Sequence, residues 1–213
     1  MEESKVPLPT LERLATYLRY LNESTNRDEV TISSARMEEA TGIHAAQFRK
    51  DLSYFGEFGQ PGIGYKADEL RQRIAAILKV EDTQPVILIG AGNLGSALLG
   101  YAGLPQHNFP IVGVFDNNAN KIGYKLWNRT IEDIADLKAI NRELKSQIAI
   151  VCVPNAAAQK VADQLVDAGI RVILNFAPTV LRVPERVFVR NVCFVQELMV
   201  LSFFLSPGLQ AGD

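Results

Sequence analysis

Two groups of residues in this 213-residue sequence have types and spacings that could do chemistry. The first is Gly90-Ala91-Gly92-Asn93-Leu94-Gly95, which fits the G-x-G-x-x-G pattern of a dinucleotide-binding turn. In such a turn the first glycine permits the sharp bend, and the second lets the backbone approach a pyrophosphate. The third allows the next helix to pack closely on the sheet. Alone the pattern is weak, because many glycine-rich turns match it by chance.

The surroundings of this turn strengthen the interpretation. It follows the apolar run Val86–Ile89 and opens a predicted helix over 93–101, whose first N–H groups would face the phosphates. Asp116 ends the next apolar run, 26 residues after Gly90 against a usual spacing of about 20. Its carboxylate would bind the adenosine ribose and repel a 2′-phosphate, and no arginine follows closely, so NAD(H) is favoured over NADP(H). A coenzyme A-binding domain, or the same fold with an empty site, is the alternative.

The second group lies on a predicted helix over 44–55. Its inner face carries Ala45, Phe48, Leu52 and Phe55, and its outer face carries Gln47, Lys50, Asp51 and Tyr54, with Arg49 at the edge. Glutamine, lysine and arginine hydrogen-bond base edges or phosphates, and a tyrosine can bond a phosphate or stack. DNA repels an aspartate, so we expect Asp51 to orient Arg49 or Lys50 instead. A solvated polar face on a small helical domain is the alternative.

The elements that must position this helix form a small N-terminal domain. Thr10 is predicted to cap a helix over 11–23, and Ser33-Ser34 to cap a short helix that ends at Gly42. Two short helices joined by such a glycine turn are typical of the helix-turn-helix motif. The segment Gly56–Tyr65, with four glycines and a proline, predicts a tight β-hairpin, or wing. A further helix is predicted over 67–78.

A polar linker at 81–85 precedes a different pattern, in which apolar strands alternate with helices. Strands are predicted at 86–89, 111–115, 148–153, 172–176 and 187–192, and helices at 93–101, 131–144 and 156–168. Such continuously apolar strands indicate a parallel sheet covered on both faces. The expected fold is therefore α/β. It comprises a winged helix-turn-helix domain (1–80), a Rossmann-like NAD(H)-binding domain (81–192) and an apolar C-terminal helix (193–213).

Composition limits the classes of function. Hydrophobic residues make up 47% and charged residues 22%, as in ordinary globular proteins. The formal net charge is −2, and residues 1–80 hold 11 basic and 12 acidic side chains, so bulk charge supports neither a DNA binder nor an anionic-membrane binder. No signal peptide and no apolar run of about 18 residues is visible, which predicts a cytoplasmic protein without a membrane span.

The residues that could serve a metal or a hydride-transfer enzyme are few. Cys152 and Cys193 lie in apolar runs and are expected to be buried, reduced thiols, and with two histidines they are too few for a metal site. His44 and His107 lie away from the predicted strand ends, where a dehydrogenase would need an acid–base group. We therefore expect a cofactor sensor and no enzyme. The alternatives are an NAD-dependent Rossmann enzyme with a winged-helix appendage and a nucleotide-dependent protein-interaction module.

The segments Gln47–Gly56, Gly62–Tyr65, Gly90–Gly95 and Ile173–Pro178 together closely resemble the redox-sensing transcriptional repressor Rex family, over about 7–205. The resemblance implies a homodimer that reads the NADH/NAD⁺ balance, binds a palindromic operator DNA and releases it when NADH closes the dimer. It also implies that the C-terminal helix is domain-swapped. That agrees with the nine large apolar residues within 194–205, since a helix apolar nearly all round must be buried on several sides. A simple buried core helix is the alternative.

The resemblance carries roles to matching positions. It implies DNA contacts at Ser33, Ser34, Gln47, Arg49, Lys50, Tyr54, Gly59 and Gly62. It implies cofactor contacts at Gly90, Ala91, Gly92, Asn93, Leu94, Gly95, Tyr101, Asp116, Val153, Pro154, Asn175 and Phe176, and at Phe194, which would reach the partner's pocket. Two departures matter. Gln60-Pro61 replace a basic wing tip, which predicts weaker or less salt-sensitive DNA binding. Cys193 stands where an aspartate completes a switch triad with Arg19 and Tyr101, so the charge-pair form of that switch is incomplete.

Overall fold

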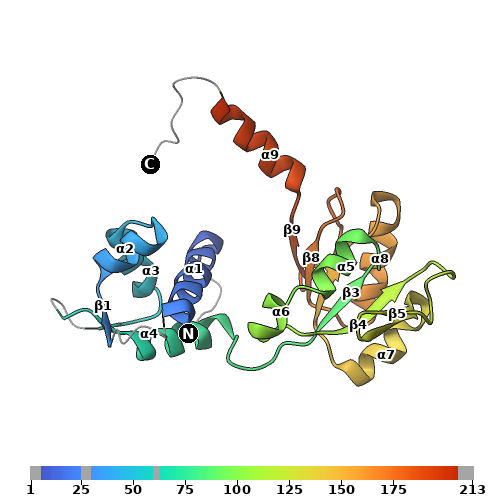
Figure 1. The fold of residues 1–213 in the computed structure, drawn as a ribbon, viewed down its shortest axis with the longest axis horizontal. Coiled ribbons are helices and arrows are strands. Elements are labelled where there is room, and N and C mark those ends of the chain that lie inside the picture. Colours follow the sequence, from blue (N-terminus) through green and yellow to red (C-terminus); the bar gives the residue numbers. More distant parts are fainter. Residues whose placement is uncertain (1–5, 25–29, 60–62, 206–213) are drawn as a thin grey trace. The chain divides into compact units, whose positions relative to one another are not determined.

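The structure is a computed structural model that describes residues 6–24, 30–59 and 63–205. Its internal contacts divide the chain into two units, one ending at Asp82 and the other starting at Thr83. Each unit has its own hydrophobic core. Figure 1 shows the helices and strands of both units.

The first unit is helical. It contains α1 (Leu8–Ser24), α2 (Ser34–Thr41), α3 (Ala45–Ser53) and α4 (Ala67–Leu78), with the short antiparallel strands β1 (Thr31–Ile32) and β2 (Tyr65–Lys66). The predicted pair of short helices is confirmed. The Ser33 side chain caps α2 by accepting the N–H of Arg36 at 3.1 Å, and Gly42 ends it with a φ of 71°. Phe48 and Leu52 of α3 lie in the core with Tyr17 of α1, as the apolar spacing predicts.

Two expectations for this unit need correction or stay open. Thr10 does not cap α1, because the helix already begins at Leu8. Pro9 fits its first turn, where a missing N–H costs no helical hydrogen bond. The strand β1 was not predicted, and β2 pairs with it in the register Ile32↔Tyr65. The wing tip with Gln60, Pro61 and Gly62 lies outside the described residues, so the hairpin stays a prediction.

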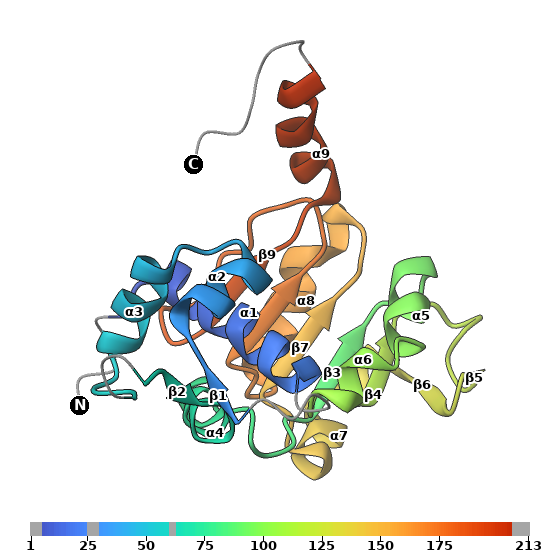
Figure 2. The ribbon, with the colours of Figure 1, turned by 60° about the vertical axis from the view of Figure 1, so that its left-hand side comes forward.

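The second unit is built on one sheet, shown in Figure 2, with the strand order β5-β6-β4-β3-β7-β8-β9. The strands are β3 (Val86–Ile89), β4 (Ile111–Asp116), β5 (Lys125–Leu126), β6 (Arg129–Asp133), β7 (Ile148–Val151), β8 (Val172–Asn175) and β9 (Phe188–Asn191). All neighbours run parallel except β5 and β6. From β3 the chain passes to β4 on one side and later to β7 on the other. The strand order therefore switches at β3.

Helices cover both faces of this sheet, as predicted. Ile87 and Ile89 pack with α7 (Leu137–Leu144) and α8 (Asn155–Asp167), whereas Val86 and Leu88 pack with the other face's α5 (Asn93–Leu99) and α6 (Gly103–Gln106). Alternate residues of one buried strand thus serve two cores. This explains why the strand reads as continuously apolar.

The helix predicted over 131–144 is wrong in its first half. Residues 129–133 form β6, which pairs parallel with β4 and antiparallel with β5, and a 3₁₀ turn (Ile134–Asp136) leads into α7. Trp127 adopts a φ of 53° in the tight turn between β5 and β6. Ile131, Ile134 and Leu137 are all buried at three-residue spacing. That spacing suggests a helix although two elements share it.

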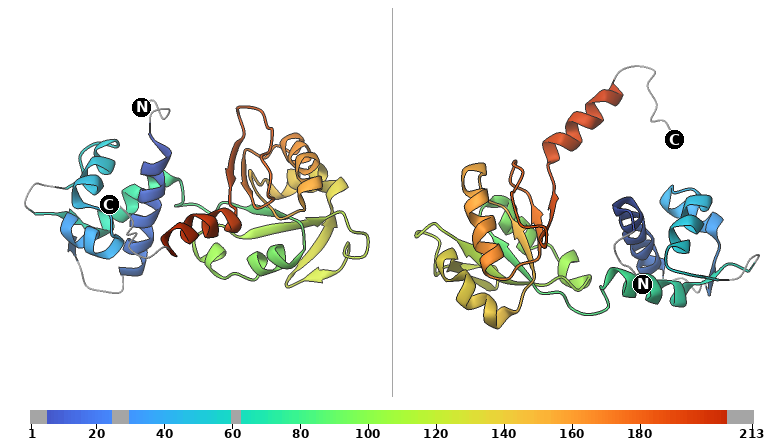
Figure 3. Two further views of the ribbon diagram at one scale, coloured as in Figure 1. Left: turned by 90° about the horizontal axis from the view of Figure 1, so that it is seen from above. Right: turned by 180° about the vertical axis from the view of Figure 1, so that it is seen from behind.

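The C-terminal helix α9 (Phe194–Ser202) and a 3₁₀ turn (Phe203–Leu205) follow β9 and extend away from the sheet, as Figure 3 shows. All nine of the large apolar side chains in 194–205 are exposed in the single chain. None of the described helices is long and apolar enough to cross a membrane.

Candidate nucleotide site and nucleic-acid interface

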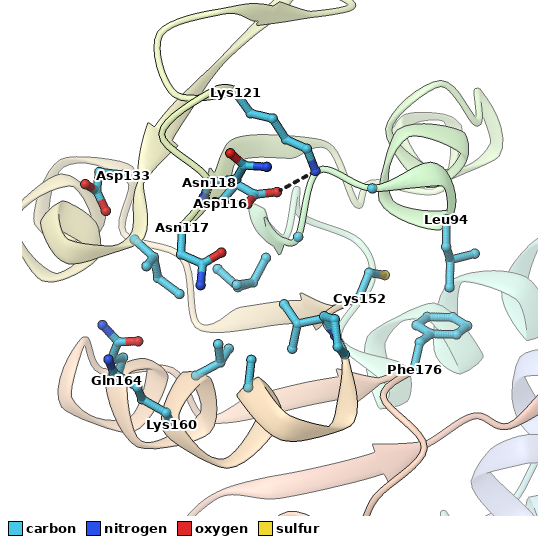
Figure 4. Close-up of a pocket in the computed structure, with 18 of the residues that line it drawn as sticks. Leu94, Asp116, Asn117, Asn118, Lys121, Asp133, Cys152, Lys160, Gln164 and Phe176 are labelled. Carbon is cyan, nitrogen blue, oxygen red and sulfur yellow. Dashed lines mark hydrogen bonds and ion pairs between the residues drawn. The ribbon is translucent and has the colours of Figure 1, made fainter.

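A hollow of the second unit, shown in Figure 4, lies at the carboxyl ends of β3, β4 and β7 and has a volume of about 780 Å³. Its walls come from the turn after β3, from the loops after β4, β6 and β7, and from α8. This is the position of the strand-order switch, where open parallel sheets bind their ligands.

The glycine turn forms the floor of the cavity. Gly90 has a φ of 100°, and a Cβ there would lie 2.5 Å from the carbonyl oxygen of Cys152, so only glycine fits. A Cβ on Gly95 would overlap the carbonyl oxygen of Gly90, whereas one on Gly92 would meet nothing within 4 Å. The three positions thus differ as expected for the bend, the helix packing and an open approach to the backbone.

Asp116 holds this turn in place. Its carboxylate accepts the N–H of Ala91 and the N–H of Asn118, each at 2.9 Å, and lies 3.3 Å from the ammonium of Lys121. Burial raises the pKa of Asp116, but these two amides and the Lys121 ammonium outweigh burial and hold that pKa below its ordinary value. Lys121 also donates to the carbonyl oxygen of Ala91 at 3.2 Å. A carboxylate and a cation therefore stand side by side at this end of the cavity.

The opposite end of the cavity is apolar. Leu94, Val153, Pro154 and Phe176 line it, and the Phe176 ring lies 5.9 Å from the Phe194 ring at the start of α9. Cys152 also lines the cavity, and burial raises the pKa of its thiol to about 12. A thiol with so high a pKa stays protonated at neutral pH and is a poor nucleophile.

The structure separates the predicted cofactor residues into two sets. Gly90, Gly92, Leu94, Asp116, Val153, Pro154 and Phe176 line the cavity, and Ala91 and Gly95 build the turn beneath it. Asn93 and Tyr101 do not line it, and Tyr101 is 62% exposed beyond the end of α5. Asn175 is buried, and its amide donates to the carbonyl oxygens of Ala177 and Thr179 and to the Asn191 side chain. It shapes the segment after β8 and is absent from the lining.

Sequence reasoning missed many of the residues that line the cavity. The missed residues are Asn117, Asn118, Lys121, Cys152, Asp133, Ile134, Ala135, Ala157, Lys160, Val161 and Gln164. The first three follow Asp116 directly along the loop after β4, so the position of that aspartate could have indicated them. The residues of β6 and the 3₁₀ turn could not be found, because that segment was predicted to be helical.

The first unit has a hollow of about 730 Å³ of mixed polar and apolar lining, between the start of α2, α3 and the segments on either side of the wing tip. It brings together Ser33, Ser34, Arg49 and Gly59 from the predicted DNA-contacting set. The guanidinium of Arg49 donates to the Ser34 hydroxyl at 2.8 Å, which ties the exposed side of α3 to the start of α2. Lys50 and Tyr54 are exposed on α3 outside the hollow. Gly62 lies outside the described residues.

Asp51 contradicts its expected place on the exposed face. It is fully buried and accepts hydrogen bonds from Arg13 and Tyr17 of α1, and Gln47 donates to it at 2.8 Å. It therefore faces α1 and orients neither Arg49 nor Lys50. Within the described part of the chain, no ion pair involves Arg49 or Lys50.

The start of α3 is fixed across the turn. Glu38 of α2 accepts the N–H of Ala45 at 2.9 Å and lies 3.0 Å from the ring of His44. The Ala45 N–H and then His44 lower the pKa of Glu38, so it stays an anion at the N-terminus of α3, where a negative charge is stabilising. Among the described residues, no group of three or more His, Cys, Asp and Glu side chains could hold a metal ion.

Family models and curated relatives both match this chain. Residues 81–179 match the family described as "CoA binding domain", and residues 5–53 match "Putative DNA-binding protein N-terminus". A protein of Carboxydothermus hydrogenoformans named "Redox-sensing transcriptional repressor Rex" is 46% identical over 95% of this chain and 98% of its own length. The protein of the same name from Pelotomaculum thermopropionicum is 44% identical over the full length of both chains.

Solved structures agree with these matches. The chain is similar to "RSP in complex with beta-NAD+ and operator DNA", with a TM-score of 0.89, 38% identity and coverage of 95% of this chain and 94% of the other. It is also similar to "RSP in complex with beta-NADH", with a TM-score of 0.84, 36% identity and 95% coverage of both chains. Both the fold and the sequence of this chain thus match one family over nearly the whole length.

Proposed function

This chain belongs to the Rex family of redox-sensing transcriptional repressors, and we propose that it binds operator DNA as a dimer and releases it when NADH occupies the cavity of its second unit. The relatives are named as repressors, so the chain is a regulator and not an enzyme. The observation that carries the proposal is that one chain combines a helix-turn-helix unit, whose α3 exposes the cations Arg49 and Lys50, with a Rossmann-like unit that has an open glycine-turn cavity.

The cavity has the chemistry that NAD(H) requires at each end. The space beside the Cα of Gly92 is open, so a pyrophosphate could approach the backbone there and would hydrogen-bond the N–H groups at the start of α5. The Asp116 and Lys121 end would take the adenosine ribose, and the apolar wall of Ile134 and Val161 would take the adenine. The nicotinamide would then lie at the apolar end beside Phe176.

The predicted preference for NAD(H) over NADP(H) rests on more than the charge of Asp116. Because Lys121 lies 3.3 Å from that carboxylate, the pair presents little net charge to a ribose substituent. The preference would therefore come mainly from the enclosure of the ribose by the turn and the Asn118 loop, where a 2′-phosphate has no dedicated arginine. Asp116 would act on the ribose while already holding the Ala91 amide.

On the first unit, the DNA-contacting surface would consist of Ser33, Ser34, Arg49, Lys50, Tyr54 and Gly59, with Gly62 at the wing tip. The α3 helix would lie in the major groove, where Lys50 and Arg49 can reach base edges or phosphates. The serines at the start of α2 would bond a phosphate. A twofold-symmetric dimer would present this surface twice, which matches a palindromic operator.

The C-terminal helix supports a dimer. Its apolar residues, including Leu198 and Met199, are more than half exposed in the single chain, and such a continuous apolar surface marks a protein–protein contact. We assign residues 193–213 to a segment that is swapped onto the second unit of the partner. Phe194 already touches Phe176 at the apolar end of the cavity, so this helix starts beside the proposed nicotinamide position. A repressor acts on DNA, so we place the protein in the cytoplasm.

A gel-shift experiment tests this function and separates it from the alternatives. The full-length protein would be mixed with the best duplex selected from a random-sequence library, with a scrambled duplex of equal length, and with or without NADH. We expect a shift specific to the selected duplex that NADH weakens; a tenfold loss needs only about 1.4 kcal/mol of coupling. The absence of a sequence-specific shift would exclude the repressor, and a shift that ignores NADH would exclude the sensor. Turnover of NADH with a small substrate would support the enzyme.

A further inference from the structure

The carboxylate of Asp51, on α3, accepts several side-chain hydrogen bonds from described residues of the first unit. Its side chain is fully buried. Arg13 of α1 donates to it twice, through Nε and Nη2, both at 2.6 Å. The Tyr17 hydroxyl donates at 3.0 Å, the Thr10 hydroxyl at 3.3 Å, and the Gln47 amide at 2.8 Å. Asp51 thus connects three side chains of α1 to the helix that carries the proposed DNA-contacting residues.

This network is an ionic one, since Asp51 stays charged despite its burial. Burial raises the pKa of Asp51, but the hydrogen bonds from Arg13, Gln47 and Tyr17 outweigh burial and bring that pKa below its ordinary value. A buried carboxylate without such partners would be strongly destabilising. Two parallel bonds from one guanidinium also fix direction as well as distance. The contact therefore sets how α3 is rotated and shifted along its axis relative to α1.

The same network engages Gln47. A glutamine that reads adenine in the major groove must present its amide oxygen and its NH₂ group together. Here the NH₂ group of Gln47 donates to Asp51 from one turn earlier on α3, and the side chain is half-buried. Lys50 differs, because its side chain is exposed on the neighbouring face and makes no ion pair within the described part of the chain.

From this geometry we infer that Arg13, Gln47 and Asp51 are positioning residues that hold the DNA-reading helix in register, and that Gln47 reads no base. The inference rests on the proposed function and deepens it, because it assigns base discrimination to Lys50 and its exposed neighbours. Gln47 then matters through Asp51. The hydrogen-bond network of Asp51 also couples α1 rigidly to α3, so a displacement of α1 would displace the DNA-reading helix.

The test is to select preferred duplexes from a random library with the wild type and with the variants Gln47→Ala and Lys50→Ala, all as full-length protein. We expect Gln47→Ala to keep the wild-type base preference at every position, whereas Lys50→Ala loses preference at one position of each half-site. A changed base preference in Gln47→Ala would overturn the inference while leaving the repressor intact. A wild type without any preference would overturn the repressor and the inference together.

Two further variants separate positioning from simple stability. Arg13→Lys keeps the charge but cannot make two parallel bonds, and Asp51→Asn removes the charge. We expect both to lower the ratio of selected-duplex to scrambled-duplex affinity, by at least tenfold for Asp51→Asn. The affinity of the second unit for NADH should stay within twofold of wild type in both variants. The affinity for the scrambled duplex should do so too, since it depends on the retained surface cations. These two controls would show that the variants are folded. If Arg13→Lys kept the wild-type ratio of selected-duplex to scrambled-duplex affinity, charge alone would matter and the positioning role would be overturned.

Discussion

The glycine turn allows cofactor binding and folding to be separated by alanine substitution. At Gly92 a Cβ would meet no atom within 4 Å, and the φ of −86° suits any residue. We therefore expect Gly92→Ala to fold as the wild type does. The new methyl group would nevertheless stand in the space that the pyrophosphate must enter to reach the backbone N–H groups.

The size of the effect follows from the bond that is lost. A methyl group would keep the phosphate oxygens out of hydrogen-bonding distance of the N–H groups, which breaks at least one hydrogen bond to a charged group. Such bonds contribute about 1.5–3 kcal/mol. At about 1.4 kcal/mol per tenfold, NADH affinity should fall roughly 10- to 150-fold. The unfolding temperature of Gly92→Ala without NADH should differ from that of the wild type by no more than an ordinary surface substitution would cause.

Gly95→Ala is the matched comparison. A Cβ there would overlap the carbonyl oxygen of Gly90, and backbone cannot move aside as a flexible side chain can. Forcing extra volume into a packed site costs about 1–3 kcal/mol or more, so this variant should lower the unfolding temperature of the second unit by several degrees. It should also lose NADH binding, but as a consequence of the distorted turn.

Fluorescence gives the assay. Trp127 is the single tryptophan of the chain, and its indole N–H donates to the carbonyl oxygen of Ser96. It therefore lies against α5, the helix that follows the glycine turn. NADH bound nearby should quench its emission by energy transfer, and titration gives the affinity. Wild-type NADH affinity in Gly92→Ala would refute the assignment of this turn to the pyrophosphate. An unchanged unfolding temperature in Gly95→Ala would refute its packing role.

Four other outcomes follow from the same structure. Leu198→Asp should convert the dimer to monomer in size-exclusion chromatography with light scattering, since it places a charge in the apolar surface of α9; an unchanged mass would argue against that interface. Lys121→Met should weaken NADH binding about tenfold by tryptophan quenching, because Asp116 loses its cation. The pKa of Asp51 is lower in the folded chain, so its stabilising effect is complete above the unfolded value near 3.8 and is lost as pH falls through the folded value. Denaturant unfolding should therefore show the gap between wild type and Asp51→Asn closing below pH 4. Arg49→Ala should reduce the salt slope of operator affinity by about 2 per dimer, one phosphate contact per protomer, in binding assays at several salt concentrations, because the Arg49 guanidinium lies 2.8 Å from the Ser34 hydroxyl at the proposed phosphate contact.

The sequence was a good guide where one local rule determined the outcome. The Ser33 cap, the Gly42 terminator and the apolar strands follow from local hydrogen bonding and from a sheet covered on both faces, and all were predicted. The segment around Ile131 was not, because its three-residue apolar spacing continues into α7. What makes it a strand is the turn at Trp127 and pairing with β4, and pairing depends on a partner far away in sequence.

The candidate site residues show the same division. The lining of the cavity near Gly90 and Asp116 was predicted from a motif whose spacing encodes its geometry. Asp51 was assigned to the wrong face, because its charge grouped it with the polar residues Gln47 and Tyr54, which lie next to it on a helical wheel. Its burial depends on Arg13 and Tyr17, which lie on α1. The sequence pattern of α3 alone cannot indicate these partners. Lys121 was missed for a related reason, since a loop places its ammonium on Asp116.

The charge of the first unit can now be reconciled with DNA binding. Several of its cations are already neutralised inside the unit, Arg13 by Asp51 and Lys66 by Glu69 among them, so the near-zero sum of charges says little about any one face. Arg49 and Lys50 project from the same helix without an ion pair among the described residues. Two cations per protomer give weak attraction to any single phosphate track, because the affinity from counterion release grows with their number. Binding then requires both protomers at the correct spacing, which is the condition that a change in dimer geometry on NADH binding can remove.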